Sequence, residues 1–446
     1  MQKRYQVLVA EHFGQATTTA PGPRLLPALT TAWAATQAAW RFYHNPRLTP
    51  QRLAQPLRAA AAELVPTHCT DFVLAVHDWS DLDYRSHTSK QDCLVLGQKE
   101  EIGYELHSCL LLSETTGDPL SPVYQALKSA DGLTSSRQAH TTPWPATRTN
   151  LDAVLGTMNY VGRLQLGRRA VHLIDAEADS VFHFRAWHKA QHLFVVRVRG
   201  ARKVKHRGQI RSLNEVAQQL RRQRALTFSR TVVYHGRPAQ QFVAAATVVL
   251  YRAARRERRA EGQPRTVPGK PLTLRLVVSE VRDTEGRVLA VWLLLTNVPE
   301  RVAAAEIALW YYWRWRIESY FKLLKAAGQQ VEHWQQETAE ALFRRLLIAS
   351  MACVLTWQVA LQPGPDGESL RALLIRLSGR VLKRGQPWTL PALFAGVQVL
   401  LATLWVQEEY SAAEVRKLAQ GLALPHVVNA GARPSRKPRT RHGPAP

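Results

Sequence analysis

The sequence predicts an α/β fold with a β-rich segment inside it and helical regions at both ends. The first observation is the succession of an apolar strand, a strand pair, a helix around 151–167 and a second apolar strand. This order is typical of an α/β layer rather than a helical bundle. The second is a series of strand-like runs between 193 and 297, and the third is helical periodicity from about 302 to about 420.

The individual elements follow from local patterns. Residues 1–66 contain Ala-rich amphipathic segments interrupted by prolines, and we expect helices there. FVLAVHD (72–78) and RAVHLID (169–175) are short apolar runs that each end on an acid, and both are predicted strands. Segment 94–114 predicts two further strands, and segment 179–191 a helix. The strand-like runs of the β-rich block are 193–199, 226–234, 240–250, 272–282 and 288–297.

These patterns divide the chain into five parts, of which the α/β core is interrupted once. The last part is rich in basic residues and proline and has no acid, which is typical of a disordered tail. The parts are a helical N-terminal region (1–66), an α/β core in two pieces (67–192 and 293–345), a β-rich insertion (193–292), a helical C-terminal region (346–428) and the basic tail (429–446).

The charge of the chain is strongly positive. Fifty-nine Lys and Arg residues stand against 34 Asp and Glu residues, which leaves a formal net charge of +25. Such an excess favours a polyanionic partner, because each neutralised phosphate releases condensed counterions. Two basic clusters, 197–211 and 252–265, fit a surface that contacts DNA phosphates, although solvated loops of the same composition need no partner.

Cysteine content and hydropathy bear on the compartment. None of the four cysteines forms a CxxC pair, which predicts a reducing cytoplasm rather than a disulfide framework. The N-terminus lacks the apolar core of a signal peptide. Two apolar runs, 346–361 and 389–406, approach membrane length, but the first is short and the second contains polar residues. We therefore expect buried bundle helices and no membrane contact.

The stretch WYYWRWRIESYFKLLK (310–325) places charges and aromatic side chains in an unusual order. On one continuous helix, a stripe roughly 80° wide carries one acid among a tyrosine and three bases. The members of this stripe are Tyr311, Arg314, Glu318, Lys322 and Lys325. The flank expected to face the core contains Trp310, Ile317, Tyr320, Phe321 and Leu324. A solvated helix would scatter its charges, so the stripe indicates a site for phosphate or hydroxyl groups.

Glu318 alone cannot hold a catalytic pair of metal ions, since two-metal phosphoryl transfer uses about three acids around ions roughly 3.5–4 Å apart. Asp78 and Asp175 directly end apolar strands, where a side chain is held by the sheet and still faces the substrate. Aspartates also cap turns after strands, so either residue alone favours a structural role. The neighbouring acids that compete for the same roles are Asp81, Asp83, Glu177 and Asp179. Helix capping is the commoner use of an acid placed like Asp179.

The chain resembles the DDE transposases of the cut-and-paste bacterial insertion-sequence type, in the insertion sequence four family. Tyr311, Arg314, Glu318 and Lys325 match the branch signature Tyr-x2-Arg-x3-Glu-x6-Lys at all four positions. Three other segments resemble family motifs in the same order: IDAEAD (174–179), FVVR (194–197) and WLLLT (292–296). The resemblance extends over about 72 to 340 and does not reach the two helical ends of the chain.

The resemblance implies an RNase H-like catalytic core that is interrupted by the β-rich insertion. It also implies that Asp78, Asp175 and Glu318 ligate two Mg²⁺ or Mn²⁺ ions. These ions would activate water for nicking and then the freed 3′-hydroxyl for attack. Phosphates of the transposon end would be held by Tyr311, Arg314 and Lys325, and the stripe adds Lys322 as a further DNA contact.

The branch usually forms a DNA hairpin, which requires one base to leave the stack and to rest on an aromatic side chain. Trp292 matches the stacking tryptophan of the family through its WLLLT context. The alternative is a tryptophan that fills the core between the insertion and the catalytic sheet. Arg197 is a second DNA contact implied by the resemblance, with a solvated strand end as the alternative. The run DWSDLDY (78–84) departs from the family, because Trp79 is bulky and Asp81 adds an uncommitted acid, which is a candidate for a supporting role around the metal ligands.

The leading hypothesis is an active transposase that cleaves double-stranded DNA at terminal inverted repeats and joins the ends to target DNA. We expect a homodimer in the synaptic complex, recognition of the ends by the N-terminal region, and action at the nucleoid in a bacterial cytoplasm. Two alternatives stay open. One is a catalytically silent protein that occupies DNA ends and inhibits transposition, and the other is an RNase H-like nuclease that does not join.

Overall fold

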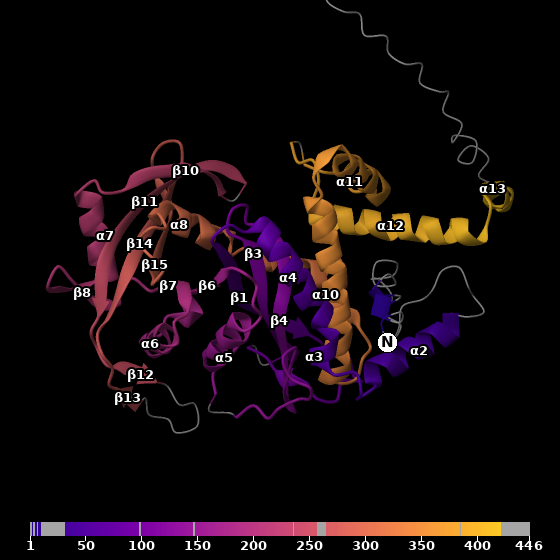
Figure 1. Ribbon diagram of the computed structural model, residues 1–446, viewed down its shortest axis with the longest axis horizontal. Helices are drawn as coiled ribbons and strands as arrows, with labels where there is room; N and C mark the ends of the chain where they lie inside the picture. Colours follow the sequence, from indigo (N-terminus) through magenta and orange to yellow (C-terminus); the bar gives the residue numbers. More distant parts are fainter. Residues whose placement is uncertain are drawn as a thin grey trace, which may run out of the picture.

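The computed structural model describes residues 2, 5–6, 8–9, 32–97, 100–145, 148–234, 236–256, 265–383 and 385–420. Its centre is a 13-stranded mixed sheet, with a separate two-stranded sheet beside it. Figure 1 shows the large sheet extending from β4 through β1 to β11. The predicted α/β class is confirmed. The basic tail and much of the N-terminal helical region lie outside the described residues.

Five strands form the half of the sheet that carries the two aspartates. They are β1 (Phe72–Asp83), β3 (Ile102–Ser113), β4 (Pro119–Ser129), β6 (Arg169–Ile174) and β7 (Leu193–Arg197). β3 pairs antiparallel with both β1 and β4. On the other side, β6 runs parallel to β1, and β7 runs parallel to β6. The order β4-β3-β1-β6-β7 therefore joins an antiparallel trio to a parallel trio through β1.

The insertion continues this sheet. β15 pairs antiparallel with β7, and β14 and β11 follow in turn. The domain boundaries stay a prediction, and the sheet crosses the one at 192 without a break, because β6 and β7 are paired neighbours. The other described strands are β2 (Leu94–Val95), β5 (Gly132–Ser135), β8 (Lys203–His206), β9 (Gln209–Ser212), β10 (Thr227–Tyr234), β11 (Arg237–Leu250), β12 (Ala254–Arg256), β13 (Arg265–Val267), β14 (Leu272–Arg282) and β15 (Val288–Thr296).

Two apolar cores form on opposite faces of the sheet, because alternate residues of a strand point to opposite sides. On β7, Val195 belongs to the first core, whereas Phe194 and Val196 belong to the second. Figure 1 shows α4 and α10 beside β4, and α5 and α6 below β6 and β7. The helices of the first core include α4 (Gln55–His68) and α10 (Ala339–Leu361), and those of the second are α5 (Asn150–Gly162), α6 (Val181–Lys189) and α7 (Leu213–Arg222).

Segment 94–114 contains the two predicted strands, a two-residue β2 and the long β3. The sequence pattern missed β4, because PLSPVYQALKS contains two prolines and prolines are rare inside strands. The structure accommodates Pro122 at a shift of register between β3 and β4, a position at which a strand tolerates the missing N–H group.

The helical ends contain α2 (Ala32–His44) and α3 (Pro50–Leu53) before the sheet, and α11 (Gly364–Ser378), α12 (Leu390–Glu409) and α13 (Ala412–Gln420) after α10. The apolar run 346–361 lies within α10, and most of its residues are buried, as predicted. Among the described residues, α12 alone has the length and apolar composition to cross a membrane. Only 24% of its apolar stretch is buried, so the expectation of a buried bundle helix is wrong for the run 389–406. The first turns of α12 contact α10 and α11, and Figure 1 shows the rest extending away from them.

The stretch 310–325 forms two helices and not one. α8 (Ala304–Trp313) ends before Arg314, and α9 (Arg316–Leu324) begins two residues later. At the junction, the N–H groups of Arg314 and Glu318 bond to carbonyls three residues earlier, which is the tighter 3-10 pattern. The assumption of a single helical wheel is therefore wrong at this junction. It is also wrong at Lys325, whose backbone has left the helical region with ψ −135°.

The predicted core flank of this stretch is confirmed, since Trp310, Ile317, Tyr320, Phe321 and Leu324 are all buried. Tyr320 fixes α9 against the rest of the molecule through a closed set of buried hydrogen bonds. Gln125 on β4 donates its amide N–H to the Tyr320 hydroxyl at 2.6 Å. Ser350 on α10 bonds the same hydroxyl at 2.8 Å and the Gln125 carbonyl oxygen at 3.1 Å.

We expect Tyr320→Phe to lower the free energy of unfolding by about 1–3 kcal/mol, because the Gln125 amide would lose its buried partner. Urea denaturation measures the change. Tyr410→Phe is the matched control, since Tyr410 is exposed on the surface. Equal stability of the two variants would show that this network does not hold α9 in place.

Candidate active site

Three carboxylates from distant parts of the sequence meet at one edge of the sheet. The pairing of β1 with β6 ends at Val76 and Leu173, so Asp78 and Asp175 both lie just beyond the paired region. Glu318 reaches the same edge from the first turn of α9. Burial raises the pKa of Asp78, and the charge of Asp175 adds to this effect. Burial also raises the pKa of Glu318, and the charge of Asp78 adds to it.

Each aspartate is held by a local backbone bond. Asp78 accepts a hydrogen bond from the N–H of Trp79 at 3.0 Å. Asp175 accepts one from the N–H of Glu177 at 2.8 Å and thereby caps the short 3-10 helix η1 (Ala176–Ala178). Capping is the structural role that such an acid ordinarily has, and here it leaves the second carboxylate oxygen for another partner.

Arg314 lies between two of the acids and is only 5% exposed. Its guanidinium donates to Asp78 at 2.9 Å and to Glu318 at 3.4 Å. Burial alone would lower the pKa of Arg314, but the surrounding negative groups outweigh burial and raise it. The position of Arg314 depends on the helix junction, which turns its side chain toward β1.

The other residues of the stripe are placed differently from one another. Tyr311 is buried, and burial raises its pKa. Lys322 is exposed one turn beyond Glu318, where its charge stabilises the ionised carboxylate. Lys325 follows the end of α9 and is already engaged, since its ammonium donates to the carbonyl of Asp81 and forms an ion pair with Glu332 at 3.1 Å.

The two insertion residues of the prediction also lie near Tyr311. Arg197 ends β7 and is partly exposed, and its charge acts on Tyr311. Trp292 on β15 is 8% exposed, with its ring 6.1 Å from that of Tyr311 and 6.3 Å from that of Tyr312. In this conformation Trp292 fills the core between the insertion and α8, and a base cannot stack on it unless the ring becomes exposed.

The unusual residues after Asp78 do not crowd that carboxylate. The Trp79 ring stacks on His107, with centroids 4.5 Å apart, and packs against the second core. Since adjacent residues of a strand point to opposite faces, Trp79 lies on the face away from Asp78 and α9. Asp81 contributes its backbone carbonyl to Lys325, and burial raises the pKa of its carboxyl group.

Two of the competing acids can now be separated. Asp179 does not cap α6, whose N-cap is Ser180. Its carboxylate instead accepts from Arg202 at 2.7 Å and from the N–H of Arg199 at 2.9 Å. Glu177 lies near Asp175 and Asp78, since burial first and then the charges of these two aspartates raise its pKa. Glu177 is thus a fourth acid of this edge.

Trp315 is a candidate that the sequence pattern did not single out. It occupies the junction between α8 and α9, is 47% exposed, and lies with its ring centroid 5.0 Å from the Arg314 guanidinium. On one continuous helix it would lie about 20° from Lys322, at the margin of the stripe. The wheel could therefore have included it, and its exposure is what the sequence pattern does not reveal.

The donor set suits a hard divalent cation, because carboxylate oxygens are the ligands that Mg²⁺ and Mn²⁺ prefer. Among the described residues, no three histidine, cysteine or acidic side chains lie close enough together to hold a metal ion. Arg314 supplies positive charge between Asp78 and Glu318 in this arrangement. An ion would therefore require the carboxylates to come closer together than they lie here.

We expect Arg314→Gln to lower the free energy of unfolding at neutral pH by about 3 kcal/mol, because a buried ion pair loses one partner. Without the guanidinium, the pKa of Asp78 and of Glu318 would rise further above their ordinary values, so the folded state would favour the protonated acids. The deficit should then shrink as the pH falls from 8 toward 5. Urea denaturation across this range tests the prediction.

Arg316→Gln is the matched control, because Arg316 is exposed and only two residues from both Arg314 and Glu318. A deficit of Arg314→Gln that does not change with pH would contradict the coupling between the guanidinium and the acids.

Comparison with known proteins adds little to this geometry. No protein-family model and no curated protein matches the chain. Seven chains of solved structures are similar, one of them in a cryo-EM structure of a piggyBac transposase synaptic complex with hairpin DNA. The likeness has a TM-score of 0.36 and 10% sequence identity, and it covers 91% of this chain and 72% of that chain. It is too distant to assign a family or an activity to this protein.

Proposed function

We propose that this protein is a DDE-type DNA transposase that cleaves double-stranded DNA at the ends of its element and joins the ends to a target. The observation that carries the proposal is the meeting of Asp78, Asp175 and Glu318 at one sheet edge. They come from β1, the end of β6 and α9. Three acids converging from separate elements are the arrangement that two-metal phosphoryl transfer uses.

The topology supports an RNase H-like core for this site. The strand order β4-β3-β1-β6-β7, antiparallel on one side of β1 and parallel on the other, is interrupted between β7 and α9 by the β-rich insertion. The match of Tyr311, Arg314, Glu318 and Lys325 to the branch signature supports the insertion-sequence type.

The three acids would hold one or two Mg²⁺ or Mn²⁺ ions, with Glu177 beside them. When bound, such ions lower the pKa of an attacking hydroxyl group and neutralise charge on the phosphoryl group. The chain's own residues have a complementary task. Lys322 is exposed and suited to bind a phosphate. Arg314 and Tyr311 are buried here and would contact a phosphate only after metal replaces Arg314 as the partner of the acids and the site opens.

Lys325 would contribute differently from the expectation of a direct phosphate contact. It holds the carbonyl of Asp81 and the carboxylate of Glu332, and so ties β1 to the segment after α9. In the proposed complex it binds a phosphate by exchanging one of these partners. Arg197, at the same edge, is suited to contact the DNA beside the cleaved bond.

An unpaired base at the hairpin stage needs an aromatic surface. Trp315 offers one at the active site, because nearly half of its surface is exposed and Arg314 covers part of the ring. Trp292 would serve only after a rearrangement that uncovers it. We therefore propose Trp315 as the first base contact and Trp292 as a second one.

The proposed partners are the terminal inverted repeats, target DNA and a second copy of the chain, in a bacterial cytoplasm. The apolar side chains of Val399 and Leu404 are exposed on α12, which supports dimerisation through the C-terminal helices. The N-terminal region is proposed to take part in recognising the DNA ends.

We expect Glu318→Gln to reduce cleavage of a duplex that carries the flanking inverted repeats by on the order of 10³-fold or more, because one of three metal-holding charges is lost. Labelled DNA with Mg²⁺ or Mn²⁺ measures nicked, hairpin and joined products separately. Glu285→Gln, the same change at an exposed turn, is the control. Binding without cleavage by the wild type would favour the silent inhibitor, and nicks without joining would favour the nuclease.

The roles of the two tryptophans can be separated. We expect Trp315→Ala to leave the free energy of unfolding within about 0.5 kcal/mol of the wild type, because the residue is exposed. The same variant should reduce the ratio of hairpin to nicked product. Trp292→Ala should lower the free energy of unfolding by about 3–5 kcal/mol, because its ring is buried. A normal hairpin ratio in Trp315→Ala would remove Trp315 from the proposal.

A further inference from the structure

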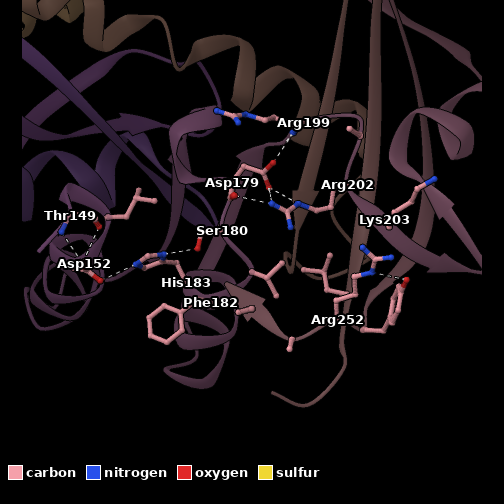
Figure 2. A pocket seen from close by; sticks show the side chains of 17 residues that line it. Thr149, Asp152, Asp179, Ser180, Phe182, His183, Arg199, Arg202, Lys203 and Arg252 are labelled. Carbon is pink, nitrogen blue, oxygen red and sulfur yellow. Dashed lines mark hydrogen bonds and ion pairs between the residues drawn. The ribbon is translucent and has the colours of Figure 1, made fainter. Parts of the chain in front are cut away.

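A pocket of about 740 Å³ lies between the starts of α5 and α6 on one side and the β7–β8 turn and the end of β11 on the other. Figure 2 shows its labelled lining residues: Ser180 and His183 lie on the α6 side, and Arg202, Lys203 and Arg252 lie opposite them. Asp179, four residues after Asp175, forms part of its wall. The segment 175–179 therefore links the edge that carries Asp175 to the wall of the pocket.

The charge of this pocket is mostly basic, and its acids are already engaged. Asp179 binds Arg202 and the backbone of Arg199, and only 5% of its side chain is exposed. Asp152 accepts hydrogen bonds from the N–H and the hydroxyl of Thr149 at 2.9 and 3.0 Å. The four bases that line the pocket are Arg199, Arg202, Lys203 and Arg252. Two engaged acids thus face four bases.

Arg199 and Arg252 are the two bases available for a ligand. Both are exposed, and neither forms an ion pair with an acid among the described residues. Arg252 donates to the hydroxyl of Tyr251 at 3.0 Å, which fixes the direction of its guanidinium without neutralising it. Lys203, in contrast, bonds to Glu215 at 3.3 Å.

Asp179 has a positioning role in this arrangement. It joins the start of α6 to the β7–β8 turn through three bonds, because its carboxylate binds the Arg199 N–H and Arg202 while its carbonyl oxygen accepts from Arg202 at 2.9 Å. These bonds hold the β7–β8 turn in one conformation, and Arg199 lies on this turn. The first residues of α6 also line the pocket, and the start of a helix carries partial positive charge.

We propose that this pocket binds phosphates of the duplex DNA backbone next to the cleavage site, through Arg199 and Arg252, on a turn ordered by Asp179. The position of these phosphates next to the cleavage site rests on the proposed function. The binding itself needs no catalysis. Phosphate contacts of this kind position the duplex without reading its sequence.

Binding of a labelled duplex of arbitrary sequence, measured by fluorescence anisotropy between 50 and about 300 mM salt without divalent cations, tests the site. Each phosphate contact contributes about 0.9 to the slope of log K against log salt, so Arg199→Gln with Arg252→Gln should reduce that slope by about 1.8. The control pair, Arg222→Gln with Arg224→Gln, removes the same charge from exposed positions at the end of α7. An equal reduction by the control pair would overturn the proposal.

The variant Asp179→Asn separates the effect of Asp179 on the conformation of the turn from its effect on net charge. Loss of a negative charge should strengthen DNA binding if only net charge matters, whereas the proposal expects about threefold or more weaker binding, because the turn loses its order. Thermal unfolding followed by circular dichroism checks that the variant is folded. Tighter binding by folded Asp179→Asn would overturn the positioning role.

Two further outcomes distinguish this proposal from a nucleotide-binding site and from the proposed catalytic function. The first outcome is that millimolar ATP displaces DNA from the wild type, and that the Arg199/Arg252 variant no longer binds ATP but still binds DNA as the wild type does. In that case the pocket is a nucleotide site and the proposal is wrong. If the salt slope falls as expected while the wild type never cleaves DNA, the proposed catalytic function fails and the DNA-binding pocket stands.

Discussion

The buried guanidinium of Arg314 is the interaction on which the arrangement of the site depends. It joins Asp78 on β1 to Glu318 on α9, two residues that are 240 positions apart in the sequence. Without a positive charge at this point, acids brought together at a sheet edge would repel each other in a poorly solvated place. The α8–α9 junction, the Tyr320 network and the cap at Asp175 can all be understood as holding side chains at fixed positions around this charge.

Much of the fold could be predicted because it rests on local patterns. Apolar runs such as FVLAVHD and RAVHLID form strands wherever both faces of a sheet are covered, and both were recognised by that property. β4 was missed because Pro119 and Pro122 argue locally against a strand, and only the pairing with β3 outweighs them. The continuation of the sheet into the insertion depends on long-range pairing of β7 with β15, which no local pattern encodes.

The site was predictable to the extent that it depends on residue type. Acids that end apolar strands identified Asp78 and Asp175, and the structure brings them to one edge with Glu318. Their roles as metal ligands stay a prediction. The helical wheel failed for Lys325, because its backbone leaves the helical conformation at the end of α9. The wheel places Trp315 beside Lys322, but it does not show which aromatic side chains of the stretch are exposed. Exposure distinguishes Trp315 from Trp292, and it follows from tertiary packing alone.

The uninterrupted sheet between the two halves of the protein has a mechanical consequence. Strands that share a ladder of hydrogen bonds do not swing about a hinge, so a force applied to the insertion reaches β7 and then β6 as strain and not as rotation. Asp175 follows β6 by a single residue. A displacement of the insertion would thus be transmitted along the sheet to Asp175 and would change the distance between Asp175 and the other acids.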